Sequence, residues 1–283
     1  MTFKTTHNNY RLVDNNDVPL YHYDIDDYTA RENESHQEHK NLNYKSAYDG
    51  YKGVVWTPLD LPFLDIDLDH LWNVWQDVHQ YKKEGLAQPW FDERPDDMNS
   101  SRHSVYTDHD YRALICFKNT DYYSTNVKGE WYQVIRDEFP QVVDFCENHL
   151  PFDNLRFVAF AGRDEHGVGP HYDEDYKNRH RLFGQEPSQI RIRWSNVTTP
   201  ETEHLYFTND HAKTRLYPML PNDTNAMAWD GQVHEHGADK GYHPTERMIL
   251  MPMGTLNIKK WHDLLDRSIE KYKDYVITVD HFK

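Results

Sequence analysis

Short apolar or alternating segments separated by polar turns dominate the chain after residue 154. Alternation with a period of two is typical of a strand that buries one face. Several short strands at regular spacing predict a β-sandwich or a barrel. The predicted strands cover residues 155–161, 189–194, 204–207, 215–220, 225–229 and 247–251.

Apolar residues spaced three and four apart predict helices on both sides of this β region. One helix begins near Leu68, and a final helix contains Trp261 and Leu265, with a short strand expected in residues 275–279. Residues 112–117 form one more predicted strand. Helical spacing also extends over residues 131–150. Because Pro140 removes a helical hydrogen bond there, a single helix and two helices meeting near Pro140 both remain open.

These elements predict an α+β protein, mainly β. Residues 1–50 are polar, with few periodic apolar positions, and we expect poor order or late docking there. Residues 51–283 are expected to form a single domain. Within it, residues 51–153 form a helical flanking region, 154–256 the β core, and 257–283 a C-terminal helix and tail.

Composition narrows the class of protein. Aromatic residues make up 14% of the 283 residues, which favours a folded chain. The formal net charge of −16 disfavours nucleic-acid and anionic-membrane partners. No apolar run is long enough to span a membrane, and a cytoplasmic location is expected. Cys116 and Cys146 lie in apolar runs and are expected to be buried free thiols.

Candidate metal ligands lie in two segments of the β region. In a strand, His171 and Asp173 point to the same face. A third ligand must come from elsewhere, and residues 230–236 offer His234 and His236. We prefer His234, because Asp230 lies four residues before it, but His236 remains open. Two histidines and one carboxylate that leave open positions suit Fe(II) oxygenases, and a catalytic zinc site is the weaker metal alternative. Surface histidines in an Asp-rich chain are the plain alternative.

Three arginines would suit an anionic ligand. Arg247 precedes an apolar strand, 13 residues after His234 and 11 after His236. Arg191 and Arg193 alternate with isoleucines, so they share one strand face. On a solvent face they would be ordinary surface residues, whereas inside a barrel they would form an anion-binding wall.

The order of these residues resembles the aspartyl/asparaginyl β-hydroxylase-like branch of the Fe(II)/2-oxoglutarate dioxygenases, which includes bacterial free-proline hydroxylases. The matching pattern is His171-x-Asp173, Arg191-x-Arg193, Asp230-x-x-x-His234 and Arg247. The resemblance covers about residues 155–253. It implies a double-stranded β-helix core (a jelly roll, similar to cupins) and an oxidoreductase that uses Fe(II), 2-oxoglutarate and O2.

The resemblance also implies roles. His171, Asp173 and His234 match the iron ligands, with His236 as the alternative distal ligand. Arg247 matches the anchor of the distal carboxylate of 2-oxoglutarate, and Arg193 matches an arginine near the co-substrate. The family has a histidine two residues after that arginine, whereas this chain has Ser195 at that position.

The expected reaction is hydroxylation of a C–H bond in a small molecule, with a free amino acid or a derivative as the favoured substrate. Candidate substrate contacts are Arg191, Trp229 and Arg181. Hydroxylation of a protein Asp or Asn side chain is the nearest alternative. A cupin-like module without turnover and a zinc hydrolase are alternatives from other classes. The sequence leaves the oligomeric state open.

Overall fold

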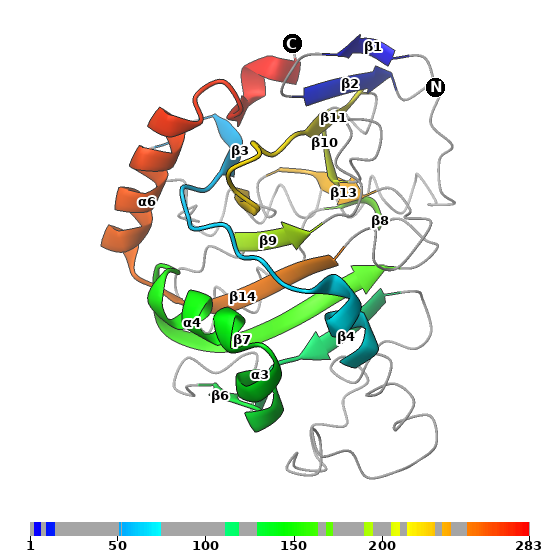
Figure 1. Ribbon diagram of the computed structural model, residues 1–283. Coiled ribbons are helices and arrows are strands. Elements are labelled where there is room, and N and C mark those ends of the chain that lie inside the picture. The colour runs from blue at the N-terminus through cyan, green and yellow to red at the C-terminus, as the bar shows by residue number, and fades with distance from the viewer. Residues whose placement is uncertain are drawn as a thin grey trace, which may run out of the picture.

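Two antiparallel sheets face each other in the computed structural model of the chain (Figure 1). Apolar side chains from both sheets meet in one buried cluster between them. The structure describes residues 3–6, 10–14, 51, 53–74, 111–118, 129–163, 168–171, 190–194, 205–209, 214–229, 234–238 and 248–282.

The larger sheet has seven strands in the order β15-β3-β12-β9-β14-β7-β4. In that order the strands are β15 (Ile277–Thr278), β3 (Val54–Pro58), β12 (Ala226–Trp229), β9 (Ile190–Trp194), β14 (Met248–Leu256), β7 (Phe152–Arg163) and β4 (Tyr111–Ile115).

The smaller sheet has six strands in the order β1-β2-β11-β10-β13-β8. They are β1 (Phe3–Thr6), β2 (Tyr10–Asp14), β11 (Thr214–Pro218), β10 (Leu205–Asn209), β13 (His236–Ala238) and β8 (Val168–His171). A separate pair joins β5 (Phe117–Lys118) to β6 (Glu130–Trp131).

The chain crosses repeatedly between the two sheets from β7 to β14. Strands β7, β9, β12 and β14 belong to the larger sheet, and β8, β10, β11 and β13 belong to the smaller one. As a result, several neighbours in a sheet are distant in sequence, as in the pairing of β8 with β13. This crossing brings side chains from several segments into the space between the sheets.

The structure confirms the prediction of a mainly β, α+β chain. Each of the six strands predicted between residues 155 and 251 is present, within a few residues at its ends. The strands at 112–117 and 275–279 are present as β4, β5 and β15. Strands β1, β2, β3, β6 and β13 were not predicted. Of the two N-terminal strands, β1 pairs with β2, and β2 also pairs with β11.

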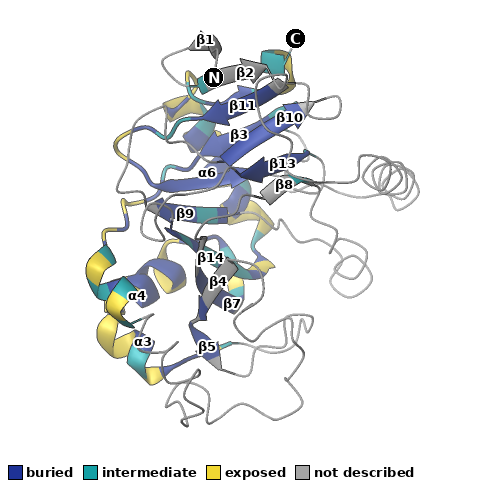
Figure 2. Ribbon diagram, turned by 90° about the vertical axis from the view of Figure 1, so that its right-hand side faces the viewer, coloured by how far each residue is buried: buried dark blue, intermediate teal, exposed yellow. Residues whose placement is uncertain are grey.

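Helices cover the outer face of the larger sheet. They are α3 (Gln133–Glu138), α4 (Pro140–Asn148) and α6 (Ile258–Lys271), and residues 68–74 are also helical. Pro140 is the first residue of α4, where its missing N–H is not needed. The alternative of two helices meeting at this proline is therefore the one observed. Figure 2 shows exposed residues on the outer surface of α3 and α4.

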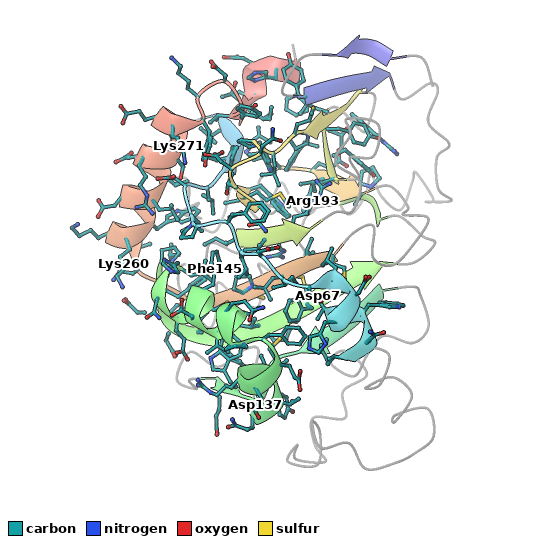
Figure 3. The ribbon with its side chains drawn as sticks, viewed as in Figure 1. Asp67, Asp137, Phe145, Arg193, Lys260 and Lys271 are labelled. Carbon is teal, nitrogen blue, oxygen red and sulfur yellow. The ribbon has the colours of Figure 1, made fainter. Side chains whose placement is uncertain are left out.

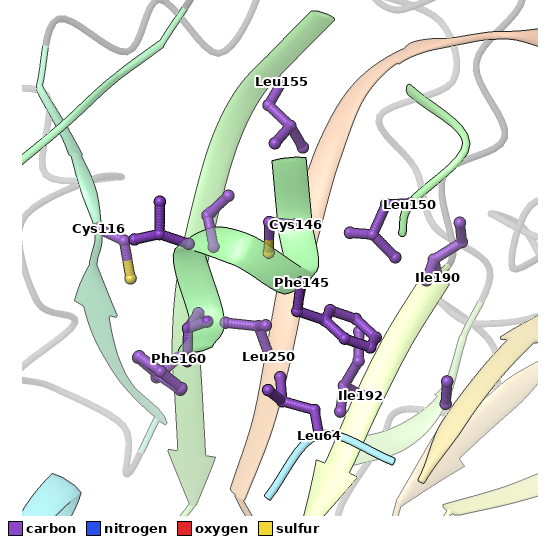
Figure 4. Close-up of a cluster of buried hydrophobic side chains, with 14 of the residues drawn as sticks. Leu64, Cys116, Phe145, Cys146, Leu150, Leu155, Phe160, Ile190, Ile192 and Leu250 are labelled. Carbon is purple, nitrogen blue, oxygen red and sulfur yellow. The ribbon is translucent and has the colours of Figure 1, made fainter. Parts of the chain in front are cut away.

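The core beneath these helices is built from one face of the larger sheet (Figure 4). Ile190 and Ile192 of β9 pack there with Leu250 of β14, Phe160 of β7 and Phe145 of α4. Since side chains alternate along a strand, the residues that follow each of these isoleucines must face the smaller sheet. Arg191 and Arg193 therefore point toward the space between the sheets.

The core between the sheets is smaller and richer in aromatic residues. It contains Trp56 of β3, Met227 and Trp229 of β12, and Phe207 of β10. The indole N–H of Trp56 donates to the sulfur of Met227 at 3.4 Å. Strand β3, from the region preceding the predicted β core, therefore completes the packing between the sheets.

Cys116 and Cys146 are buried free thiols, as the apolar runs around them predicted. Burial raises the pKa of both thiols well above the ordinary value. Among the described helices, none has the length and apolar character that a membrane span requires.

Gly254 permits a close approach of β14 to β7. The pairing of these strands shifts between Met253 and Gly254, and a Cβ atom on Gly254 would collide with the carbonyl oxygen of Asn154. We expect Gly254→Ala to lower the free energy of unfolding by about 1–3 kcal/mol, because backbone atoms would have to move. Urea denaturation measures the change.

Thr255→Ala is the matched control for this prediction. Thr255 is the next residue of β14 and is exposed, so its truncation should change stability by less than about 0.5 kcal/mol. Equal stability of Gly254→Ala and the wild-type chain would contradict the proposed collision.

Candidate functional site

His171 and His236 are direct cross-strand partners. His171 ends β8, His236 begins β13, and the two residues oppose each other in the antiparallel pairing of these strands. Directly opposed residues have side chains on the same face, with Cβ atoms roughly 4.5–5.5 Å apart. The backbone of His171 therefore lies beside that of His236, although the two residues are 65 positions apart in the sequence.

The side chain of His236 is directed at the larger sheet. The imidazole of His236 contacts Trp229 of β12, in the opposite sheet, with ring centroids 5.7 Å apart. It also lies 6.2 Å from the ring of Phe207, its cross-strand neighbour on β10. His236 is only 5% exposed, so its ring is buried between the two sheets.

A backbone contact orients the His236 ring. Its Nδ1 lies 3.1 Å from the carbonyl oxygen of His234, and a carbonyl can only accept a hydrogen bond. The proton of the neutral imidazole is therefore on Nδ1, which leaves the lone pair on Nε2. Histidines that bind a metal through one nitrogen commonly donate from the other to such a carbonyl.

The ring of His234 is engaged elsewhere. Its Nε2 lies 3.2 Å from the carbonyl oxygen of Val54, the first residue of β3. Burial lowers the pKa of His234 to about 4, so the ring is neutral near neutral pH. The structure thus places both histidines of residues 234–236 near the intersheet space, with different partners.

The two arginines of β9 form a cationic wall on the larger sheet. Arg193 is only 7% exposed, and Figure 3 shows it directed toward the smaller sheet. The Arg191 guanidinium lies over the ring of Trp229, 5.5 Å from its centroid, and donates to the carbonyl of Ile190 at 3.0 Å. Of the two faces left open by the sequence, both arginines lie on the one directed at the smaller sheet, with Arg193 buried and Arg191 half-buried.

Apolar side chains continue this wall on the neighbouring strands. Met251 and Met253 of β14 are half-buried and pack with Phe157 and Ala159 of β7. Ile249, on the same face of β14, is the cross-strand partner of Arg193. The inner face of the larger sheet thus carries guanidinium groups on β9 and, beside them, methionine and phenylalanine side chains on β14 and β7.

Trp229 completes the site with an unpaired donor. Its indole N–H is buried, and the described part of the chain provides no hydrogen-bond partner for it. A buried donor without a partner is costly to the fold, so it is a candidate contact for a ligand atom that accepts a hydrogen bond.

Glu235 lies between the two histidines and was not predicted from the sequence. It is 3% exposed, and its Oε1 has no hydrogen-bond partner among the described residues. Burial raises the pKa of its carboxyl to about 7. Only its position inside the His-Glu-His sequence could have drawn attention to it.

Several predicted site residues lie outside the described residues. These are Asp173, Arg181 and Arg247, while His171 is described only as part of β8. Across the part of the chain that the structure describes, no cluster of three or more His, Cys, Asp or Glu side chains is arranged to hold a metal.

Comparisons with known proteins find similarity in structure only. No protein-family model matches the chain. No curated protein matches it either. The activities named among the similar solved structures are those of 2OG-Fe(II) oxygenases and a prolyl hydroxylase.

Three solved structures illustrate this similarity. An oxidoreductase of the 2OG-Fe(II) oxygenase family from Burkholderia pseudomallei is 10% identical, with a TM-score of 0.33, over 84% of this chain and 96% of that one. AviO1 from Streptomyces viridochromogenes Tue57 is 12% identical, with a TM-score of 0.36, over 75% and 95%. A prolyl-4-hydroxylase from Pseudomonas putida is 10% identical, with a TM-score of 0.30, over 73% and 95%.

The donor types that the sequence offers in these segments fit a ferrous ion better than a structural zinc. The sequence contains imidazoles at His171 and His236 and a carboxylate at Asp173, and of these three side chains the structure describes that of His236. Structural zinc sites use four protein ligands, often thiolates, and both cysteines are buried in the helix-side core. Two imidazoles and one carboxylate leave the open positions that non-haem iron uses.

We expect Glu235→Gln to stabilise the metal-free chain increasingly as the pH rises from about 4.5 to 7. The folded-state pKa of Glu235 is raised above its ordinary value of 4.5, so its contribution to stability is fully present below that value and is lost as the pH passes through about 7. Glutamine does not ionise, so the free energy of unfolding of the variant should exceed that of the wild-type chain by roughly 1–3 kcal/mol at pH 8. Urea titrations with a chelator, over a range of pH, measure the difference.

Glu270→Gln is the control for charge removal, because Glu270 is exposed on α6. It should change the stability little at any pH. A Glu235→Gln chain whose stability differs from wild type by the same amount at pH 4.5 and pH 8 would contradict the buried, neutral carboxyl.

Proposed function

We propose that the chain is an Fe(II)- and 2-oxoglutarate-dependent oxygenase that hydroxylates a C–H bond of a small substrate. The observation that carries the proposal is the backbone pairing of His171 with His236, whose ring faces the space between the sheets. The pair lies opposite a strand with two inward-facing arginines.

The strand order supports a double-stranded β-helix core. The order β8-β13-β10-β11 in one sheet and β7-β14-β9-β12 in the other is the order made by a chain that winds between two four-stranded sheets. Strands β1, β2, β3, β15 and β4 extend these sheets at their edges. This core is the fold that the family resemblance implies.

We propose His171, Asp173 and His236 as the iron ligands. His236 is preferred over His234, the residue favoured from the sequence pattern, for two reasons. It is the cross-strand partner of His171, and its Nδ1 bonds to a backbone carbonyl, as is common in metal-binding histidines. His234 instead directs Nε2 at the Val54 carbonyl. Arg247 follows His236 by 11 residues, a shorter turn than His234 would require.

Arg247 and Arg193 are proposed to hold the distal carboxylate of 2-oxoglutarate. Arg247 immediately precedes β14, and Ile249, two residues later, is paired with Arg193 on the inner face. A guanidinium presents two parallel donors that match a carboxylate. Arg193 is buried, so its interaction with an anion is little weakened by water.

Iron with 2-oxoglutarate and oxygen would supply the oxidising power that replaces a C–H bond by C–OH, while 2-oxoglutarate leaves as succinate and carbon dioxide. The protein orients the ligands and excludes water. Phe207 and Trp229 enclose the His236 ring, which keeps bulk water from this side of the site.

We propose a substrate that combines an acidic group with an apolar part. Arg191 and the Trp229 N–H would bind a carboxylate, and Met251, Met253 and Phe157 would contact the apolar part. Arg181 is retained as a further candidate contact. An apolar free amino acid or a derivative fits this description better than a protein side chain, which lacks a free α-carboxylate.

We expect His171→Ala and His236→Ala each to weaken Fe(II) binding by more than about 100-fold, beyond the 10–100-fold effect typical of residues that only support a ligand. Both variants should lose succinate release. Anaerobic Fe(II) titration, followed by the visible absorption that appears with 2-oxoglutarate, measures binding.

His149→Ala is the control, because His149 is exposed at the end of α4. It should bind Fe(II) like the wild-type chain. Wild-type Fe(II) affinity in His236→Ala would exclude His236 as a ligand, and full succinate release by His171→Ala would exclude the oxygenase.

Substitutions of Arg247 and Arg191 are expected to have different effects. The first should alter the use of the co-substrate, and the second the response to the substrate. Arg247→Ala should raise the 2-oxoglutarate concentration needed for half-maximal succinate release at least about 10-fold, since a bidentate charged contact is lost. Arg191→Gln should leave that concentration unchanged and lower the stimulation of succinate release by apolar amino acids. Succinate assays at varied 2-oxoglutarate, with L-leucine, L-methionine and L-proline as probes, measure both effects. A shift of the 2-oxoglutarate requirement in Arg191→Gln alone would reverse the two assignments.

A further inference from the structure

The short strand β13 gives His236 little support of its own. The strand has three residues, and His236 is the first of them. Residues 234 and 235 precede it without belonging to a helix or a strand. Contacts made by the residues just before the strand therefore add to the packing of Phe207 and Trp229 in orienting the His236 ring.

His234 makes the contact that fixes the ring. Its carbonyl oxygen is 3.1 Å from Nδ1 of His236. The bond joins a side chain to a carbonyl two residues earlier, so it forms only if the backbone of His234 is turned toward the imidazole. Rotation of the His234 peptide would release Nδ1 and leave the ring free to change its tautomer.

The side chain of His234 holds this backbone in place. Its Nε2 is 3.2 Å from the carbonyl oxygen of Val54 in β3. Val54 is itself fixed, because its N–H donates to the carbonyl of Tyr51 at 3.1 Å and the residue pairs with Thr278 of β15. The ring of His234 thus ties the start of β13, in the smaller sheet, to the edge of the larger sheet.

We propose that His234 is a positioning residue for the metal ligand His236. Its ring, bonded to Val54, holds its own carbonyl against Nδ1 of His236, so that Nε2 of His236 faces the ion. This inference rests on the proposed function, in which His236 binds the iron. His234 then belongs to the site without touching iron, co-substrate or substrate.

The test compares two substitutions of His234. His234→Gln keeps a side-chain N–H that can donate to the Val54 carbonyl, whereas His234→Leu removes the donor and keeps an apolar side chain. We expect His234→Leu to bind Co(II), the probe in place of Fe(II), about 10–100-fold more weakly and with an altered visible spectrum. His234→Gln should recover most of the affinity and the wild-type spectrum.

The metal-free chain gives a second readout. With ¹⁵N-labelled histidine, the ring nitrogen shifts report which nitrogen carries the proton, and the His236→Gln variant identifies the signals of His236. We expect His236 to be protonated on Nδ1 in the wild-type chain and in His234→Gln, and to show a mixture of tautomers in His234→Leu. Far-UV circular dichroism verifies that each variant is folded. If His234→Leu does not fold, His234→Asn replaces it, because its shorter amide does not reach Val54.

The outcomes are distinct. Wild-type Co(II) affinity and an unchanged His236 tautomer in the folded variant without the donor would overturn the positioning role. Complete loss of Co(II) binding in both His234→Gln and His234→Leu would make His234 a ligand and would also overturn it. Unchanged Co(II) binding by His236→Gln would instead refute the ligand assignment in the proposed function. His149→Leu, at an exposed histidine, should change neither readout.

Discussion

The pairing of β8 with β13 is the interaction on which the candidate site depends. Antiparallel pairing places opposed side chains on one face, so the register of these two short strands decides whether His171 and His236 meet. A shift by one residue would turn one imidazole to the outer face of the sheet. The register is held from the other side of β13, where Leu205, Tyr206 and Phe207 of β10 oppose its three residues.

The larger sheet supports the site because its two faces differ. Ile190 and Ile192 anchor β9 in the core beneath the helices, and the same alternation directs Arg191 and Arg193 to the other side. Arg193 is buried and Arg191 is half-buried, and burying a guanidinium group is unfavourable unless it has polar or anionic partners. The well-packed core between the larger sheet and the helices provides stability that offsets the cost of placing arginines on the other face of the sheet.

Much of this arrangement could be predicted from the sequence, and the reasons for the failures are physical. Period-two alternation identified β9 and the shared face of its arginines, and Pro140 marked the boundary between α3 and α4. Strand β13 was missed because three residues are too few to show a period. For the same reason, His234 and His236 could not be distinguished from spacing alone. Two residues apart on a strand they would be equivalent, but residue 234 precedes the strand and its ring bonds to Val54, 180 residues earlier.

The position of β3 has a consequence for dividing the chain into parts. Trp56 fills the intersheet core, Val54 accepts from His234, and both belong to a strand that precedes the main β region by about a hundred residues. A fragment cut at the apparent limits of that region, residues 154–256, would expose the side of Trp229 that Trp56 covers and would leave the His234 ring without its acceptor. A fragment that folds on its own therefore needs more than the strands of residues 154–256. It should also include β3 and β15, the strand that pairs with β3.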